Sequence, residues 1–150
     1  MIYSVDVRIE APVNDTEVTD RVADAVHNVF PEADLTHEPG LLVAEAHTLD
    51  PFSDVLHEQE ILDTARRVFR DNATETGFSF RLKKQAAYEG VVNFAVGNPD
   101  ELGDISVEVT VRDPEVGAFI DYVAPETEEG APVDPDREYG DRYDPDADDY

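Results

Sequence analysis

Apolar residues recur along this chain with two spacings, every second residue in some segments and every three to four residues in others. At the N-terminus Val5, Val7 and Ile9 alternate with charged residues, which is typical of a strand with one face in a core and one face in water. Segments that read as strands lie at residues 2–10, 33–37, 41–49, 78–82, 91–96 and 105–111.

Two other segments follow the helical spacing. We expect a first helix over residues 15–30, where Asn14 and Glu17 form a capping pair at its start. We expect a second, longer helix over residues 51–71, because Asp50 is a good N-cap and a proline follows it at the first helical position. An apolar stripe then continues along one side of this second helix.

The predicted elements follow one another in the order β-α-β-β-α-β-β-β. We interpret residues 83–90 as a loop and residues 119–123 as a last turn or strand. Two helices packed on one face of a mostly antiparallel sheet make an α+β sandwich, and alternating strands fit a sheet with one wet face. The sequence therefore predicts one α+β domain over residues 1–124.

The composition changes after this domain. Residues 126–150 hold eleven acidic residues against two basic ones, and Val133 is the only branched aliphatic residue among them. Such a segment buries too little apolar surface to offset the entropy lost on ordering. We therefore expect residues 125–150 to form an acidic disordered tail.

The whole chain is strongly acidic, with 36 acidic residues, 11 basic ones and a net charge of −25. Repulsion at this charge opposes a compact state in dilute buffer, whereas molar salt shortens the Debye length to about 3 Å and screens it. The charge favours a halophilic protein, and the alternative is an acidic protein of an ordinary cytoplasm. We expect a cytoplasmic protein, because no apolar run reaches the ~18 residues that cross a membrane and no secretion signal opens the chain.

Six of the basic residues lie together between residues 66 and 84, in a window with a net charge of +4. Cationic groups bind phosphates, an aromatic ring stacks on an unpaired base, and a glutamine bonds to a base edge. The alternative is an ordinary solvated basic loop with its tyrosine in the core. The RNA interpretation requires the cations to share one face and to stay free of neighbouring carboxylates. The candidate RNA-binding residues are Arg66, Arg70, Arg81, Lys83, Lys84, Gln85 and Tyr88.

The sequence offers no recognisable catalytic centre. It has no cysteine, no Gly-rich phosphate loop and no Gly-x-Ser-x-Gly motif. Its four histidines fall on four different predicted elements, so no metal-binding pair forms on a helix. We therefore expect a binding protein that is not an enzyme and has neither a metal nor a cofactor.

Three stretches match a known protein family. They are Gln-Glu-Ile-Leu-Asp-Thr-Ala-Arg at residues 59–66, Leu-Lys-Lys-Gln-Ala-Ala-Tyr at 82–88 and Gly-Val-Val-Asn-Phe at 90–94. Over about residues 1–124 the chain resembles an uncharacterised archaeal family described as RNA-binding, in a haloarchaeal form. Two features depart from the family pattern: Val92 stands where a cation is expected, and the acidic tail is additional.

The resemblance implies a ribosomal-protein-like sandwich, related to the fifth protein of the large ribosomal subunit, which binds 5S RNA. It also implies an RNA-binding role and no catalytic residues. Together with the basic cluster, it predicts a small protein that binds RNA. The alternative is a protein–protein adaptor whose acidic surface and tail meet a basic ribosomal or RNA-processing partner.

Overall fold

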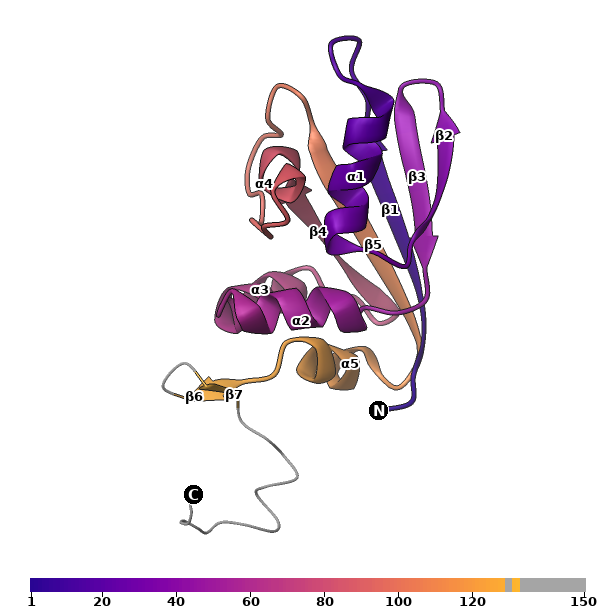
Figure 1. Cartoon of the computed structure of the whole chain (residues 1–150). Coiled ribbons are helices and arrows are strands. Elements are labelled where there is room, and N and C mark those ends of the chain that lie inside the picture. The colour runs from indigo at the N-terminus through magenta and orange to yellow at the C-terminus, as the bar shows by residue number, and fades with distance from the viewer. Residues whose placement is uncertain (129–130, 133–150) are drawn as a thin grey trace, which may run out of the picture.

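The computed structural model describes residues 1–128 and 131–132, and a five-stranded sheet organises them (Figure 1). Its strands are β1 (Ser4–Pro12), β2 (Asp34–Glu38), β3 (Leu41–Ala46), β4 (Gly77–Lys83) and β5 (Asp104–Asp113). They lie side by side in the order β2-β3-β1-β5-β4, and each strand is antiparallel to its neighbours. The predicted α+β class is therefore confirmed.

Helices gather on one side of the sheet (Figure 1). They are α1 (Thr19–Val29), α2 (Asp50–Glu58), α3 (Leu62–Asp71), α4 (Lys84–Tyr88) and α5 (Val116–Val123). All five contribute side chains to a single hydrophobic core. No helix in the described part of the chain is long and apolar enough to cross a membrane.

The alternation predicted for the first strand fixes which residues face the core. In β1 the side chains of Val5, Val7 and Ile9 are buried, whereas Arg8 between them is exposed. The central strand β5 alternates in the same way. We call the side away from the helices, formed by the outward residues of β1, β5 and β4, the outer face.

Residues 51–71 do not form one continuous helix as expected. The chain breaks between α2 and α3, where Glu60 adopts a left-handed backbone with φ of 58°. Next to it, the side-chain amide of Gln59 accepts a hydrogen bond from the Val92 N–H (2.8 Å) and donates one to the Val92 carbonyl (3.0 Å). The apolar stripe continues on both sides of the break, so the local pattern does not reveal it.

Two neighbouring predictions are also wrong. The expected loop at residues 83–90 contains the short helix α4, and the expected strand at 91–96 is reduced to one isolated bridge between Leu82 and Phe94. Residues 119–123 belong to a helix, α5, rather than to a last turn or strand.

Two smaller differences concern the start of the first helix and the beginning of the predicted tail. Helix α1 begins at Thr19, because Asn14 to Glu17 form a separate turn in which the Glu17 N–H bonds to the Asn14 carbonyl at 2.9 Å. In the expected disordered tail, Thr127–Glu128 (β6) pairs with Ala131–Pro132 (β7). The rest of the tail prediction concerns residues 129–130 and 133–150, which lie outside the described residues.

Candidate nucleic-acid interface

The two arginines predicted on the second helix lie on α3 and face the C-terminal end of the domain. Arg66 is bound by three groups: the Asp121 carboxylate at 2.7 Å, the Ala124 carbonyl at 3.1 Å and the Glu126 carboxylate at 3.2 Å. Arg70 lies 3.6 Å from the same Asp121. The side chain of Arg66 is only 12% exposed, so this arginine fastens the end of α5 and the following segment onto α3.

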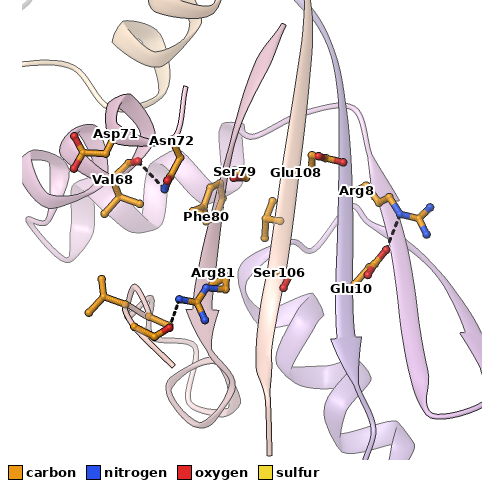
Figure 2. Close-up of a pocket in the computed structure, with 14 residues that line it drawn as sticks. Arg8, Glu10, Val68, Asp71, Asn72, Ser79, Phe80, Arg81, Ser106 and Glu108 are labelled. Carbon is orange, nitrogen blue, oxygen red and sulfur yellow. Dashed lines mark hydrogen bonds and ion pairs between the residues drawn. The ribbon is translucent and has the colours of Figure 1, made fainter. Parts of the chain in front are cut away.

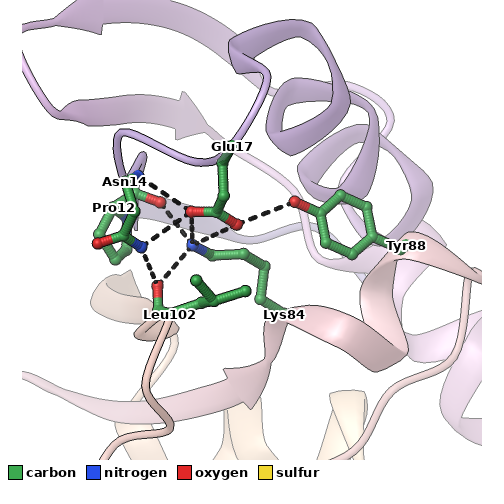
Figure 3. A network of polar contacts seen from close by, with 6 residues as sticks. All are labelled: Pro12, Asn14, Glu17, Lys84, Tyr88 and Leu102. Atoms are coloured by element: carbon green, nitrogen blue, oxygen red, sulfur yellow. Dashed lines mark hydrogen bonds and ion pairs between the residues drawn. The ribbon is translucent and has the colours of Figure 1, made fainter.

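Lys84 is buried, contrary to the expectation of a solvent-facing cation. It is 2% exposed, and its ammonium group donates to the carbonyls of Pro12 (2.6 Å) and Leu102 (2.8 Å). Both carboxylate oxygens of Glu17 accept from it as well, at 2.9 and 3.2 Å. Figure 3 shows the ammonium group joined to these partners, which come from the end of β1, the turn before α1 and the segment before β5.

The Glu17 carboxylate is the centre of this network. The Asn14 backbone N–H and the Asn14 side-chain amide both donate to it, at 3.0 and 2.9 Å. Burial raises the pKa of Glu17, but these hydrogen bonds and the ion pair with Lys84 outweigh burial and lower the pKa to about 2. The carboxylate is therefore charged at neutral pH, and it holds Lys84 inside.

Tyr88 completes the same network. Its hydroxyl donates to Glu17 Oε2 at 3.1 Å, and the Arg21 guanidinium lies 5.9 Å from its ring centroid. Burial and the hydrogen bond to the charged Glu17 raise the pKa of Tyr88. The ring is partly buried against the core, as the alternative interpretation expected, and a neighbouring cation already faces it.

The remaining candidates lie at the end of β4. Arg81 donates to the buried Asp104 carboxylate at 2.9 Å and to the Gly97 carbonyl at 2.7 Å. Lys83 and Gln85 have no ion-pair or side-chain hydrogen-bond partner within the part of the chain that the structure describes. Lys83 has the alternation of an outer-face residue, and Gln85 is exposed on α4.

The seven candidates thus lie in separate places rather than on one exposed basic surface. Nine of the eleven basic residues fall within the described residues, and six of the nine form ion pairs. The requirement that the cations share one face and stay free of carboxylates is not met. The six are Arg8, Arg66, Arg70, Arg81, Lys84 and Arg112.

A groove of about 610 Å³ crosses the outer face and reaches the end of α3 (Figure 2). Two cross-strand rows form its floor. One row is Arg8, Glu108 and Ser79, and the other is Glu10, Ser106 and Arg81. Asn72 closes the groove on the side of α3, and Val96 stands at its rim with 80% of its surface exposed.

Only Arg81 of this groove was among the candidate residues. The others were missed because the search followed charge along the sequence, whereas Ser79, Ser106 and Glu108 are brought together by strand pairing. The available signal was the spacing of these residues: on each alternating strand, polar residues two positions apart point to the same face of the sheet. Among the described residues, no group of three or more His, Asp or Glu side chains is arranged to hold a metal ion.

Comparison with known proteins identifies the family. A family model described as RNA binding matches residues 6–112, which run from β1 to the end of β5. A crystal structure of a UPF0201 protein from Methanococcus jannaschii superposes with a TM-score of 0.79 at 32% identity, covering 86% of this chain and 99% of that one. The chain belongs to the UPF0201 family.

Two curated relatives match this chain over only part of their own length. A UPF0200/UPF0201 protein of Archaeoglobus fulgidus is 34% identical over 131 residues, which are 87% of this chain and 40% of the relative. A UPF0201 protein of Methanopyrus kandleri is 51% identical over 82 residues, 53% of this chain and 52% of the relative. The chain therefore spans about half or less of the length of these two relatives.

The three stretches that suggested the family contain residues that stabilise the fold of this UPF0201 chain. Gln59 of the first stretch holds Val92 of the third through two hydrogen bonds. Lys84 and Tyr88 of the second stretch meet at Glu17. These stretches join α2, α4 and the turn before α1 to one another, so they secure the fold on the helical side.

Proposed function

We propose that this UPF0201 protein binds RNA through its outer face. The observation that carries RNA binding is the match to the RNA-binding family model over residues 6–112, a range that contains β4 and nearly all of β1 and β5. The groove supports it, because a concave polar surface on rigid strands can hold part of an extended chain in a fixed position.

The charges on the outer face also support the proposal. The outward positions of residues 6–12, 77–83 and 104–112 hold four cations and four carboxylates, so this part of the outer face is neutral in a chain of net charge −25. A polyanion is therefore repelled less here than by an average part of the surface. The cations are Arg8, Arg81, Lys83 and Arg112, and the carboxylates are Asp6, Glu10, Asp104 and Glu108.

Only part of the predicted residue set is retained for RNA contact. Arg81 and Lys83 point to the outer face, and the exposed Gln85 follows directly on α4. Lys84 stabilises the fold, since its ammonium group has four acceptor atoms within the protein. Arg66, Arg70 and Tyr88 are likewise engaged with acidic side chains away from the groove.

We further propose that the protein works at high salt, as its charge indicates. Phosphate attraction weakens steeply with salt, because the counterions that binding releases gain less entropy in a concentrated solution. Binding at molar salt then depends on hydrogen bonds, stacking and shape. The kinship with the fifth large-subunit ribosomal protein stays a prediction.

The proposal is tested by purifying the protein from its host in multimolar KCl and reading its absorbance at 260 nm. The chain has no tryptophan and six tyrosines, so its own absorbance is modest and bound nucleic acid is easily seen. We expect an excess at 260 nm that ribonuclease removes and deoxyribonuclease leaves. Protein that carries no RNA and binds none when total RNA is added back would refute the function.

A protein–protein adaptor is the second candidate, and the edge strand β2 favours it. This strand pairs only with β3, is largely exposed, and carries Asp34 and Glu38. An acidic edge of this kind suits an extended basic segment of a partner. Capture of a basic ribosomal or RNA-processing protein in the absence of RNA would support the adaptor.

A further inference from the structure

The groove on the outer face is lined by several polar side chains that have hydrogen-bonding capacity to spare. Within the described residues, the hydroxyls of Ser79 and Ser106 and the carboxylate of Glu108 have no hydrogen-bond or ion-pair partner. Asn72 donates its side-chain N–H to the Val68 carbonyl at 3.1 Å, which leaves its side-chain oxygen as an acceptor. The arginines at the two ends are already paired, Arg8 with Glu10 and Arg81 with Asp104.

These groups suit a nucleobase better than a phosphate. A phosphate is anionic and only accepts hydrogen bonds, whereas three carboxylates, those of Glu10, Asp71 and Glu108, line the groove. The Watson–Crick edge of a base carries N–H donors, which carboxylates and amide oxygens accept. The lining therefore suits the base of a nucleotide better than its phosphate.

Glu108 lies at the centre of the floor. It is directly opposite Arg8 on β1 and opposite Ser79 on β4. A carboxylate accepts two parallel donors through its two oxygens. Guanine is the standard base that presents two donors side by side on its Watson–Crick edge, the N1–H and the N2 amino group, and this edge is free only when the base is unpaired.

The walls of the groove provide faces for the plane of a base. The Arg81 guanidinium is held in one orientation by the Asp104 carboxylate at 2.9 Å and the Gly97 carbonyl at 2.7 Å. Unpaired bases stack on guanidinium planes held in this way. Val68 and the exposed Val96 add apolar surface to the lining of the groove, and Figure 2 shows Val68 on the side of α3.

We propose that the groove binds an unpaired guanine of RNA, with Glu108 accepting from the N1–H and the N2 amino group and Arg81 stacking against the ring. This inference rests on the proposed RNA-binding function and names the part of the RNA that is recognised. The volume of about 610 Å³ lies within the range of roughly 300–1,000 Å³ that is usual for small-molecule sites. Such a groove accommodates a base and its sugar, and an RNA duplex has no place in it.

The test uses fluorescein-labelled heptaribonucleotides of uridine that carry guanosine, inosine or adenosine at the central position. Inosine lacks only the N2 amino group of guanosine, so it isolates one of the two proposed hydrogen bonds. Fluorescence anisotropy in 2 M KCl gives the affinities of the wild-type chain, Glu108→Gln and Glu45→Gln. Glu45 is a matched control. It pairs with Arg8 from the neighbouring strand β3, it lies outside the groove, and its change to glutamine removes the same charge.

We expect the wild-type chain and Glu45→Gln to bind the guanosine heptamer about tenfold more tightly than the inosine heptamer, and Glu108→Gln to bind the two nearly equally. Unchanged melting temperatures verify that both variants are folded, since both side chains are exposed. Equal binding of all heptamers by the wild-type chain overturns the guanine assignment, and so does a preference that persists in Glu108→Gln. If the chain still binds cellular RNA in either case, the proposed function stands; if it binds no RNA of any kind, both fall.

Discussion

Replacing Lys84 by methionine separates a structural lysine from an RNA-binding one. The change keeps the aliphatic length of the side chain and removes the ammonium group that Glu17, Pro12 and Leu102 share. Glu17 then remains charged and buried without its counter-ion. Breaking a buried ion pair by removing one partner costs about 3–5 kcal/mol.

The pKa of Glu17 reports on the whole network around this carboxylate, to which Asn14 and Lys84 both contribute. A carboxyl pKa lowered from 4.5 to about 2 corresponds to about 3 kcal/mol of stability at neutral pH, part of which comes from Asn14. We therefore expect Lys84→Met to lower the free energy of unfolding by about 3 kcal/mol and the melting temperature by about 10 °C. Adding Glu17→Gln to the same chain should restore part of the loss, because the uncompensated charge disappears.

Lys83→Met is the control, since it removes the same group from the preceding residue, which has no ion-pair partner among the described residues. We expect a change of at most about 0.5 kcal/mol, as for surface substitutions in general. Urea unfolding at fixed KCl measures both variants. A Lys84→Met chain that is no less stable than Lys83→Met would refute the buried network.

Two further predictions concern pH and salt. The lowered pKa of Glu17 contributes stability above its unfolded pKa of 4.5, and that stability is lost as the pH falls towards about 2. Urea unfolding between pH 5 and pH 2.5 should therefore show a steeper loss for the wild-type chain than for Glu17→Gln, and parallel losses would contradict the pKa. Because the net charge is −25, the melting temperature should rise between 0.1 M and 3 M KCl, and a temperature that stays constant or falls would rule out salt adaptation.

Much of the sheet followed from local pattern. The strands around Val7 and Val107 alternate cleanly, and their alternation fixed both the element and the buried face. The elements that the local pattern did not predict depend on tertiary contacts or are very short. The break after Gln59 is held by Val92, 33 residues away, and α4 is too short for any period to show.

The dispersal of the candidate residues has a related reason. A cluster of cations in the sequence does not show where their counter-ions are, and here the counter-ions come from distant segments. Glu17 lies 67 residues before Lys84, and Asp104 lies 23 residues after Arg81. Conversely, the floor of the groove on the outer face assembles from three strands, and none of these strands has an unusual sequence on its own.

The central claim is that RNA lies on the outer face, and two double variants test it most directly. Arg8→Glu with Lys83→Glu reverses two cations of that face, whereas Arg21→Glu with Arg67→Glu reverses two exposed cations on the helices α1 and α3. Both double variants change the net charge by the same amount. A difference between their affinities for the same RNA at the same salt therefore reports only where the reversed charges lie. We expect the first pair to weaken binding about tenfold or more relative to the second. Equal weakening by the two pairs, or a larger effect of the helical pair, would contradict the account.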